Sequence, residues 1–292
     1  IYGNNIFENH PNLKIIKGDI RNIDLINKSI ENKDYIIHLA CISNDPSFEL
    51  DPELGKSINL DCFEPLIIAA KNNNIKRFIF ASSSSVYGVK QEKNVVEDML
   101  LEPLTDYSKF KVECEKILLK HFSNNFITTI LRPATVCGFA PRQRLDVVVN
   151  ILTNLAYHKR EITVFGGKQL RPNINIQDMV RAYYSVLTAN TENVNGEIFN
   201  VGYENHSVER IGEIVKNVVG DDVAFKSVPT DDNRSYHVSS KKIEEILSFN
   251  TIFTIEDASK SLLDAFESKI LHEPLTNEMY FNIKRMQKIK LK

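Results

Sequence analysis

The alternation of short apolar runs with helical patterns constrains the fold of this chain more than any other feature. Residues 34–40 (DYIIHLA), 76–82 (KRFIFAS) and 126–132 (FITTILR) are apolar runs that predict buried strands. Between them, residues 52–73 carry apolar side chains near helical spacing, and a second helix is predicted at residues 105–121. Strands that alternate with helices form a parallel sheet with helices on both faces. The first half is therefore predicted to be a doubly wound α/β sheet.

In the second half, predicted strands and helices alternate less regularly, and this pattern predicts a smaller α/β domain. Helices are predicted at residues 146–158, 178–190, 208–219, 241–248 and 255–270, and strands at residues 161–166, 197–202 and 223–228. We expect this part to lie over the carboxyl ends of the parallel strands. Ligands bind outside those ends in open α/β sheets, so a site is expected between the two parts.

Composition excludes several classes of function. The chain has 292 residues, with 36 Lys and Arg against 38 Asp and Glu, so its net charge of −2 predicts neither a nucleic-acid partner nor a membrane partner. The Lys-rich end KRMQKIKLK is predicted to be a solvated tail. The four cysteines are widely spaced, which predicts no metal site and no disulfide framework and favours a cytoplasmic location.

Three groups of residues are predicted to meet at the carboxyl edge of the sheet. HLACISNDP follows one strand, a run of four serines from Ser82 to Ser85 follows the next, and Tyr107 and Lys111 lie one turn apart on the following helix. An ammonium on the same helix face is expected to lower the tyrosine pKa from about 10. A phenolate can then take a proton from a sugar hydroxyl while a nicotinamide cofactor takes the hydride.

A second pair with the same spacing, Tyr280 and Lys284, occurs near the end of the chain. Spacing alone does not distinguish the two pairs. Tyr280 follows no serine-bearing strand and has no parallel-sheet context, so we interpret this pair as a chance match. The alternative for the first pair is that Tyr107 has no catalytic role and lies on an ordinary amphipathic surface helix. The combination of the strand ends with this helix argues against that alternative.

These stretches together resemble the extended short-chain dehydrogenase/reductase family, in particular its NAD-dependent nucleotide-sugar epimerases and dehydratases. The resemblance covers nearly the whole chain and is carried, in family order, by KGDIRN, IIHLAC, FIFASSSSVYG, YSKFKVECEK, LRPATVCG, RQRLDVVVN, FGGKQLRPNINIQDM, EIFNVG and DDNRSYHVSS. It implies a Rossmann-like dinucleotide-binding domain at residues 1–138 and about 172–202. A substrate domain is implied at about 139–171 and 203–292.

The resemblance also assigns roles to individual residues. Ser83, Tyr107 and Lys111 are the implied catalytic residues, with Tyr107 as the base and Lys111 as the ammonium that binds the ribose. The implied cofactor-binding residues are Asp19 and Ile20 at the adenine, Leu39, Ala40 and Cys41 at a strand end, and Ser82, Tyr107, Lys111, Pro133 and Val136. The implied substrate-binding residues are Ser84, Ser85, Thr135, Leu145, Asp146, Arg171 and Arg234, the two arginines pairing with a nucleotide diphosphate.

Three departures from the family pattern bear on function. The chain begins at Ile1 after the place of the glycine-rich phosphate loop, so we expect an N-terminal β-α-β segment to be missing from this sequence. NAD is the expected cofactor, and NADP stays open because the residue that separates them belongs to that segment. Ser84 and Ser85 stand where sugar 4,6-dehydratases carry Asp-Glu, which disfavours water loss. Thr135 and Pro172 replace residues of the sugar pocket, so the sugar itself is not predicted.

We therefore predict an NAD-dependent nucleotide-sugar epimerase that acts at C4 through a 4-keto intermediate and serves surface polysaccharide synthesis. A nucleotide-sugar 4-ketoreductase or dehydrogenase is the alternative, because the same residues serve both reactions. A non-catalytic protein that binds nucleotide sugars or dinucleotides is a second alternative. The family resemblance further implies a homodimer formed through the helices at residues 52–73 and 105–121.

Overall fold

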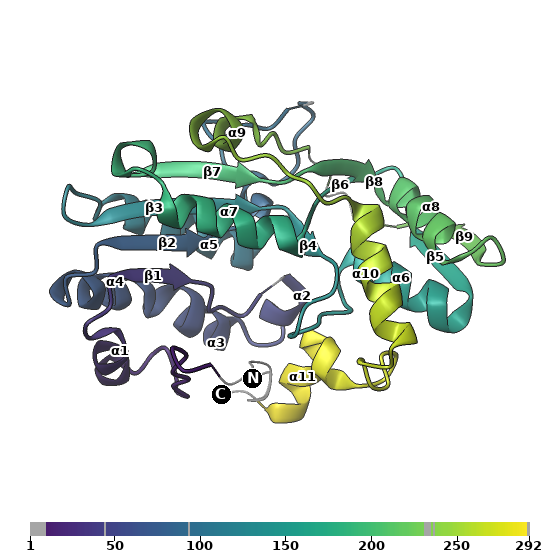
Figure 1. Ribbon diagram of the computed structural model, residues 1–292, viewed down its shortest axis with the longest axis horizontal. Helices are drawn as coiled ribbons and strands as arrows, with labels where there is room; N and C mark the ends of the chain where they lie inside the picture. The colour runs from purple at the N-terminus through teal and green to yellow at the C-terminus, as the bar shows by residue number, and fades with distance from the viewer. Residues whose placement is uncertain (1–9, 44, 93, 231–234, 236, 291–292) are drawn as a thin grey trace.

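The centre of the molecule is a parallel sheet of four strands in the order β1-β2-β3-β7 (Figure 1). The computed structural model describes residues 10–43, 45–92, 94–230, 235 and 237–290. The strands are β1 (Tyr35–His38), β2 (Arg77–Ala81), β3 (Ile127–Pro133) and β7 (Glu197–Val201). Tyr35 lies opposite Arg77, and Arg77 lies opposite Ile127, so the carboxyl ends of neighbouring strands meet at one edge. The predicted parallel sheet is confirmed.

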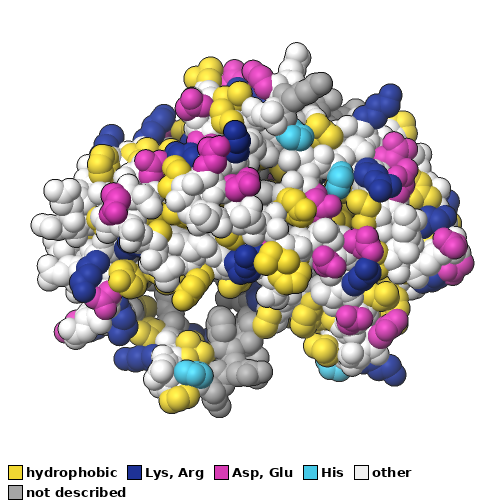
Figure 2. Space-filling view, turned by 45° about the horizontal axis from the view of Figure 1, so that its top comes forward, with side chains coloured by type: hydrophobic (Ala, Val, Ile, Leu, Met, Phe, Trp, Pro, Cys, Tyr) yellow, Lys and Arg dark blue, Asp and Glu magenta, His cyan; other side chains and the backbone are white. Residues whose placement is uncertain are grey.

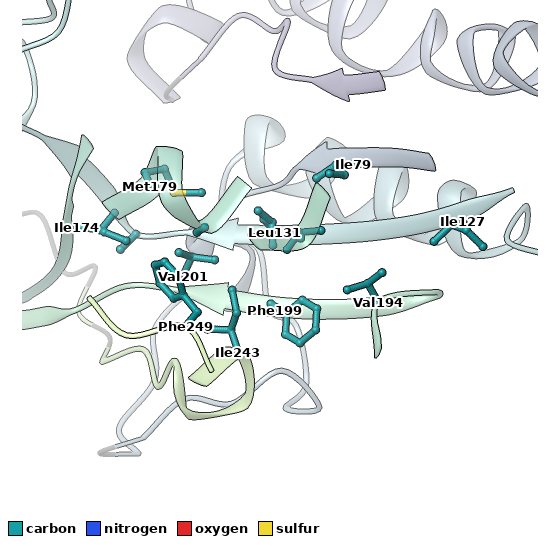
Figure 3. Packing of buried hydrophobic residues seen from close by; sticks show 13 residues of the cluster. Ile79, Ile127, Leu131, Ile174, Met179, Val194, Phe199, Val201, Ile243 and Phe249 are labelled. Atoms are coloured by element: carbon teal, nitrogen blue, oxygen red, sulfur yellow. The ribbon is translucent and has the colours of Figure 1, made fainter. Parts of the chain in front are cut away.

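Helices cover both faces of this sheet, because side chains along each strand alternate between them. On β2, Phe78 and Phe80 pack with Phe63 and Leu118 against the helices α4 (Phe63–Asn72) and α5 (Asp106–Leu119). Ile79 points the other way, into a second cluster under α7 (Ile176–Thr188) and α9 (Lys241–Leu247). Figure 3 shows this second cluster between the strands and their covering helices. Burial on both faces explains why β2 has an almost continuous apolar sequence.

A smaller assembly of strands and helices lies beside the carboxyl edge of the sheet, at the right of Figure 1. Its strands form two small sheets, β4-β6-β8 and β5-β9. Their bounds are β4 (Thr135–Cys137), β6 (Leu170–Asn175), β8 (Glu204–Ser207), β5 (Glu161–Phe165) and β9 (Ala224–Val228). The helices α6 (Val148–Lys159), α8 (Val208–Val219) and α10 (Ile255–Glu267) share one apolar core with β5. The residue boundaries that we predicted for the two domains stay a prediction.

Several elements differ from the sequence-based expectations. The predicted helix at 52–73 is three consecutive pieces: α3 (Pro52–Lys56), a π-helical turn η1 (Ser57–Asp61), and α4. The strands β4, β6 and β8 and the helices α1 (Ile23–Ile30) and α2 (Asp45–Phe48) were not predicted. These elements are short, with three to eight residues each, so they carry too few positions for a periodic pattern to stand out.

The prediction of a solvated Lys-rich tail is wrong for the part of that segment which the structure describes. The segment begins at Lys284, inside the helix α11 (Asn282–Ile289), and its Met286 is buried. The basic residues lie mainly on the outer face of this helix. A helix with only one buried side can therefore have the same Lys-rich composition as a solvated tail.

The charged side chains show no separation into large areas of one sign on the face that Figure 2 displays, where basic and acidic groups are interspersed. All four cysteines are free thiols. None of the helices among the described residues is long and apolar enough to cross a membrane.

Candidate active site

A pocket of about 550 Å³ opens at the carboxyl ends of β2 and β3 and continues along β4. It lies where ligands bind in open α/β sheets. Ten residues that the sequence singled out line it: Ser82, Ser83, Ser84, Ser85, Tyr107, Pro133, Thr135, Val136, Asp146 and Arg171. They come from four strands or strand ends, from α5, and from the loop before α6. The fold therefore brings these predicted residues to one place.

Ser83 occupies the turn that directly follows β2. Its backbone is extended, and its hydroxyl accepts a hydrogen bond from the Ser85 backbone N–H at 3.1 Å, which caps a short 3-10 helix, η2 (Ser84–Tyr87). The Ser83 and Ser85 hydroxyls lie 2.8 Å apart. Ser83 and Tyr107 both line the pocket, and the Ser83 side chain lowers the pKa of the Tyr107 phenol. The serine run thus forms a fixed cap that presents the Ser83 hydroxyl to the tyrosine.

Tyr107 and Lys111 are set by the start of α5. Thr105 caps this helix and exchanges hydrogen bonds with Ser108, so the first turn carries Tyr107 at a defined place in the pocket wall. Lys111 follows one turn later and is buried. Its Nζ atom donates to the Ala81 carbonyl oxygen at 2.7 Å, at the end of β2. The lysine therefore ties α5 to the strand that precedes Ser83.

The expectation that the lysine lowers the Tyr107 pKa is not met. Burial raises the pKa of the Tyr107 phenol well above its ordinary value, and the nearby Cys41 and Asp45 add to the rise. Arg144 and the Ser83 side chain oppose it. The Lys111 Nζ atom lies 5.7 Å from the centroid of the tyrosine ring and points to Ala81. Helical spacing placed the two residues on one face correctly, but it gave no information on burial.

Several charged side chains also line the pocket. Arg144 pairs with Asp146 through its Nε atom at 2.8 Å, and the Asp45 carboxylate accepts a hydrogen bond from the Thr105 hydroxyl. Arg171, on β6, donates to the Leu170 carbonyl at 3.1 Å. Arginines beside a polar pocket are suited to phosphate groups because each guanidinium offers parallel donors.

The other predicted residues are not part of this pocket lining. Lys111 lies beside the Tyr107 ring, and Leu145 is fully buried in an apolar cluster with Leu262 and Phe266. Asp19 is exposed and forms an ion pair with Arg21 at 2.6 Å, next to the partly buried Ile20. Leu39, Ala40 and Cys41 follow β1, and Leu39 is exposed. Arg234 lies outside the described residues.

Arg142 and Asn282 were not among the predicted site residues. Arg142 lines the pocket together with Ser43, which belongs to the predicted HLACISNDP stretch, and Asn282 is hydrogen-bonded to both of them. Arg142 lies in the RQRLD stretch that carried the family resemblance, so the signal for it was present. Asn282 had no such signal, because it approaches the pocket from the far end of the chain.

The residues at the strand ends fit the ribose and nicotinamide end of NAD. An ammonium carries three hydrogens, and Ala81 takes one of those of Lys111, so two others can serve ribose hydroxyls. The Ser83 and Tyr107 side chains line the adjoining pocket, where a reacting carbon would lie between them and the cofactor. Ser82, Pro133 and Val136 supply the remaining wall at this end.

Comparison with known proteins gives the following matches. Residues 2–202 match the model of the NAD dependent epimerase/dehydratase family. A Bacillus subtilis (strain 168) protein described as an uncharacterized UDP-glucose epimerase is 32% identical over 272 residues, which cover 91% of this chain and 79% of that protein. The human dTDP-D-glucose 4,6-dehydratase is 27% identical over 71% of this chain and 60% of its own length.

Solved structures show the same arrangement of the fold. The crystal structure of a Bacillus cereus UDP-glucuronic acid 4-epimerase, in complex with UDP-glucuronic acid and NAD, superposes with a TM-score of 0.77. Its sequence is 26% identical, and the match covers 87% of this chain and 81% of that one.

Proposed function

We propose that this chain, which belongs to the NAD dependent epimerase/dehydratase family, is an epimerase of a nucleoside diphosphate sugar and acts at C4. The observation that carries the proposal is the Ser83–Tyr107 pair in a pocket that has serines at 84 and 85. These are the positions where the resemblance places the acid pair of dehydratases. The epimerase names of the Bacillus relatives support the same choice.

The charges of the pocket also favour epimerisation over water loss. Among the described residues, the carboxylates that line the pocket are Asp45 and Asp146. Asp45 accepts a hydrogen bond from Thr105, and Asp146 is held by Arg144 and by the Asn282 backbone N–H. Serine hydroxyls at 84 and 85 do not protonate a leaving hydroxyl at neutral pH. The pocket therefore holds a proton carrier for the reacting oxygen, in Tyr107, without the acid that dehydration needs.

Each residue then has a defined task. The chemistry that NAD supplies when it is bound is reversible acceptance of hydride from the sugar carbon. Tyr107 takes the proton of the C4 hydroxyl as that carbon becomes a ketone, and returns the proton when the carbon is reduced from its other face. Ser83 hydrogen-bonds the same oxygen throughout. Lys111 binds the ribose and holds α5 against the end of β2. Arg171 binds the diphosphate.

The product is a nucleotide sugar for surface polysaccharide synthesis, which is the role that the family resemblance implies. Recombinant protein that includes any preceding segment would be incubated with UDP-, GDP-, dTDP- and CDP-sugars. We expect NMR to show inversion at C4 of one of them, with no net reduced nicotinamide by absorbance. Nicotinamide reduced or consumed in proportion to product would indicate a dehydrogenase or ketoreductase, and tight binding without any product would indicate a binding protein.

The chain offers a matched pair of variants for this test. Tyr107→Phe is expected to lower turnover by about 10²- to 10⁴-fold, the usual contribution of a proton carrier, with little change in nucleotide-sugar binding. Tyr280→Phe removes the hydroxyl of the tyrosine in the second Tyr–Lys pair. Tyr280 packs near Leu145 and does not line the pocket. This variant is expected to retain turnover. Equal turnover in the two variants would exclude Tyr107 as the base.

A further inference from the structure

The end of the chain returns to the pocket and closes one side of it. A 3-10 turn, η4 (Glu278–Tyr280), leads into α11, and α11 packs against α2 of the first half of the chain. Figure 1 shows α11 below α2, apart from the strands of the smaller assembly. We call residues 278–290 the C-terminal strap. Its contacts reach both halves of the molecule, so it bridges the pocket rather than extending one domain.

Asn282, the first residue of α11, is the strap's polar contact with the pocket. Its side chain accepts a hydrogen bond from Arg142 Nη2 at 2.6 Å and donates to Ser43 Oγ at 3.0 Å. Its backbone N–H donates to Asp146 Oδ2 at 2.8 Å. Only 1% of the residue is exposed, although it is polar. All three partners line the pocket, so a single residue fixes three parts of its wall.

The rest of the strap holds Asn282 in this place. Met286 packs into the apolar cluster of Ile42, Phe48 and Leu54, which also contacts the partly buried Tyr107. On the other side, the Tyr280 carbonyl oxygen accepts a hydrogen bond from the Leu145 backbone N–H at 2.9 Å. Glu278 forms an ion pair with Lys288 at 2.7 Å across the strap itself. Apolar packing and backbone bonding thus fix the strap independently of the Asn282 amide.

The chemistry of an amide explains why asparagine occupies this position. A carboxylate next to Arg142 would neutralise the guanidinium, whereas an amide oxygen accepts its hydrogen bond and leaves the positive charge in place. The NH₂ group of the same amide satisfies Ser43. A buried polar group of this kind is stable only when its partners are present, and Asn282 has them on both sides.

We propose that Asn282 is a positioning residue which holds Arg142 and Asp146 in the pocket wall and thereby sets the affinity for the anionic part of the substrate. The inference rests on the proposed function, because the anion is the diphosphate of a nucleotide sugar. Asn282 is assigned no role at the reacting carbon, because Arg142, Ser43 and Asp146, which it contacts, belong to the pocket wall.

The test compares three variants by calorimetric binding of UDP and dTDP and by steady-state kinetics on the best nucleotide sugar. Asn282→Ala is expected to weaken binding and to raise KM by about tenfold or more, as the loss of a hydrogen bond to a charged group does, with kcat changed less than about threefold. Asn282→Asp keeps the shape and can accept from both Arg142 and the Ser43 hydroxyl, so it is expected to fold normally. It is still expected to weaken binding, because its charge pairs with Arg142.

Asn154→Ala is the matched control. Asn154 is equally buried and its Nδ2 atom donates to the Pro274 carbonyl at 2.9 Å, just before the strap, but it does not line the pocket. A loss of stability in Asn154→Ala without a change in KM would separate positioning from folding. Unchanged affinity in both Asn282 variants, or a fall in kcat with KM unaltered, would overturn the inference while leaving the proposed function intact. A wild-type protein that binds and converts no nucleotide sugar would overturn both.

Discussion

Arg132 and Glu115 form an ion pair inside the protein, with Arg132 Nη2 2.7 Å from Glu115 Oε2 and both side chains almost completely buried. Arg132 lies on β3, and Glu115 lies one turn beyond Lys111 on α5. The Ser82 hydroxyl also donates to Glu115, so the pair lies directly behind the serine turn. Tyr87, at the end of that turn, accepts from Arg132 Nη1 at 2.8 Å. The pair thus connects α5 to β3 and to the turn that carries Ser83.

Removal of one partner is expected to destabilise the protein strongly. Glu115→Ala leaves the Arg132 charge buried without its carboxylate, which costs about 3–5 kcal/mol of the free energy of unfolding. Glu113→Ala on the same helix removes an exposed partner of Lys116 and is expected to cost under about 1 kcal/mol. Urea unfolding measures both. Similar losses in the free energy of unfolding of the two variants would show that burial of the Glu115–Arg132 pair does not make it more important for stability than an exposed pair.

The pH dependence of turnover is expected to shift in opposite directions when two charges near Tyr107 are removed. Arg144 lowers the Tyr107 pKa and Asp45 raises it, because positive charge favours the phenolate and negative charge disfavours it. Since the base is the phenolate, turnover rises with pH towards this pKa. Arg144→Gln is therefore expected to move the rise to higher pH, and Asp45→Asn to lower pH.

Profiles of kcat against pH, recorded at saturating substrate, measure these shifts. A shift of the same sign in both variants would contradict an electrostatic cause and would indicate a general disturbance of the pocket.

The sequence predicted the part of the site that follows the order of strands and helices. Ser83 and Tyr107 could be placed together because parallel strands bring their carboxyl ends to one edge, and a helix that starts after a strand starts at that edge. The helix at residues 208–219 was predicted with the bounds that the structure shows, because its apolar side chains all lie on one face. Local pattern was sufficient wherever a contact follows from the order of neighbouring elements.

The strap could not be predicted in this way. Asn282 bonds to Asp146 and Ser43, which lie 136 and 239 residues away in the sequence, and no periodic pattern spans such separations. The Lys-rich composition even suggested a solvated tail. The raised pKa of Tyr107 was missed for the same reason, because its burial depends on elements that meet only in the folded protein.

Gly55 is expected to tolerate no side chain. A Cβ atom at this position would lie 2.4 Å from the Phe48 ring, which is buried and packs against Phe110 with ring centroids 5.5 Å apart. Alanine favours a helix over glycine by about 1 kcal/mol, but overpacking of a buried ring costs about 1–3 kcal/mol. Gly55→Ala is therefore expected to lower the melting temperature and, because Phe48 belongs to α2 at the pocket, to lower turnover as well.

Lys56→Ala is the control for that variant, since Lys56 is exposed on the same helix and forms a surface ion pair with Asp61. Its melting temperature is expected to stay close to that of the wild type. A Gly55→Ala protein that melts at the same temperature as Lys56→Ala would show that the ring moves aside without cost.

His38 is expected to make the protein sensitive to mild acid. The side chain is buried among the rings of Phe63, Phe78 and Phe80, and this burial, with the charge of Lys111, lowers the histidine pKa to about 3. The unfolded chain binds a proton near pH 6.5, whereas the folded protein does not do so until about pH 3. Below pH 6.5 the unfolded state therefore gains protons first, and the free energy of unfolding falls by about 1.4 kcal/mol per pH unit.

His38→Phe replaces the imidazole with a ring of similar shape in an aromatic cluster, and it removes the titrating group. Between pH 6.5 and 5.5 its urea midpoint is expected to change less than that of the wild type. His121→Gln, at a partly exposed histidine that pairs with Glu64, is expected to keep the wild-type acid sensitivity. If His38→Phe loses stability over this pH range as steeply as His121→Gln does, the acid sensitivity arises from groups other than His38.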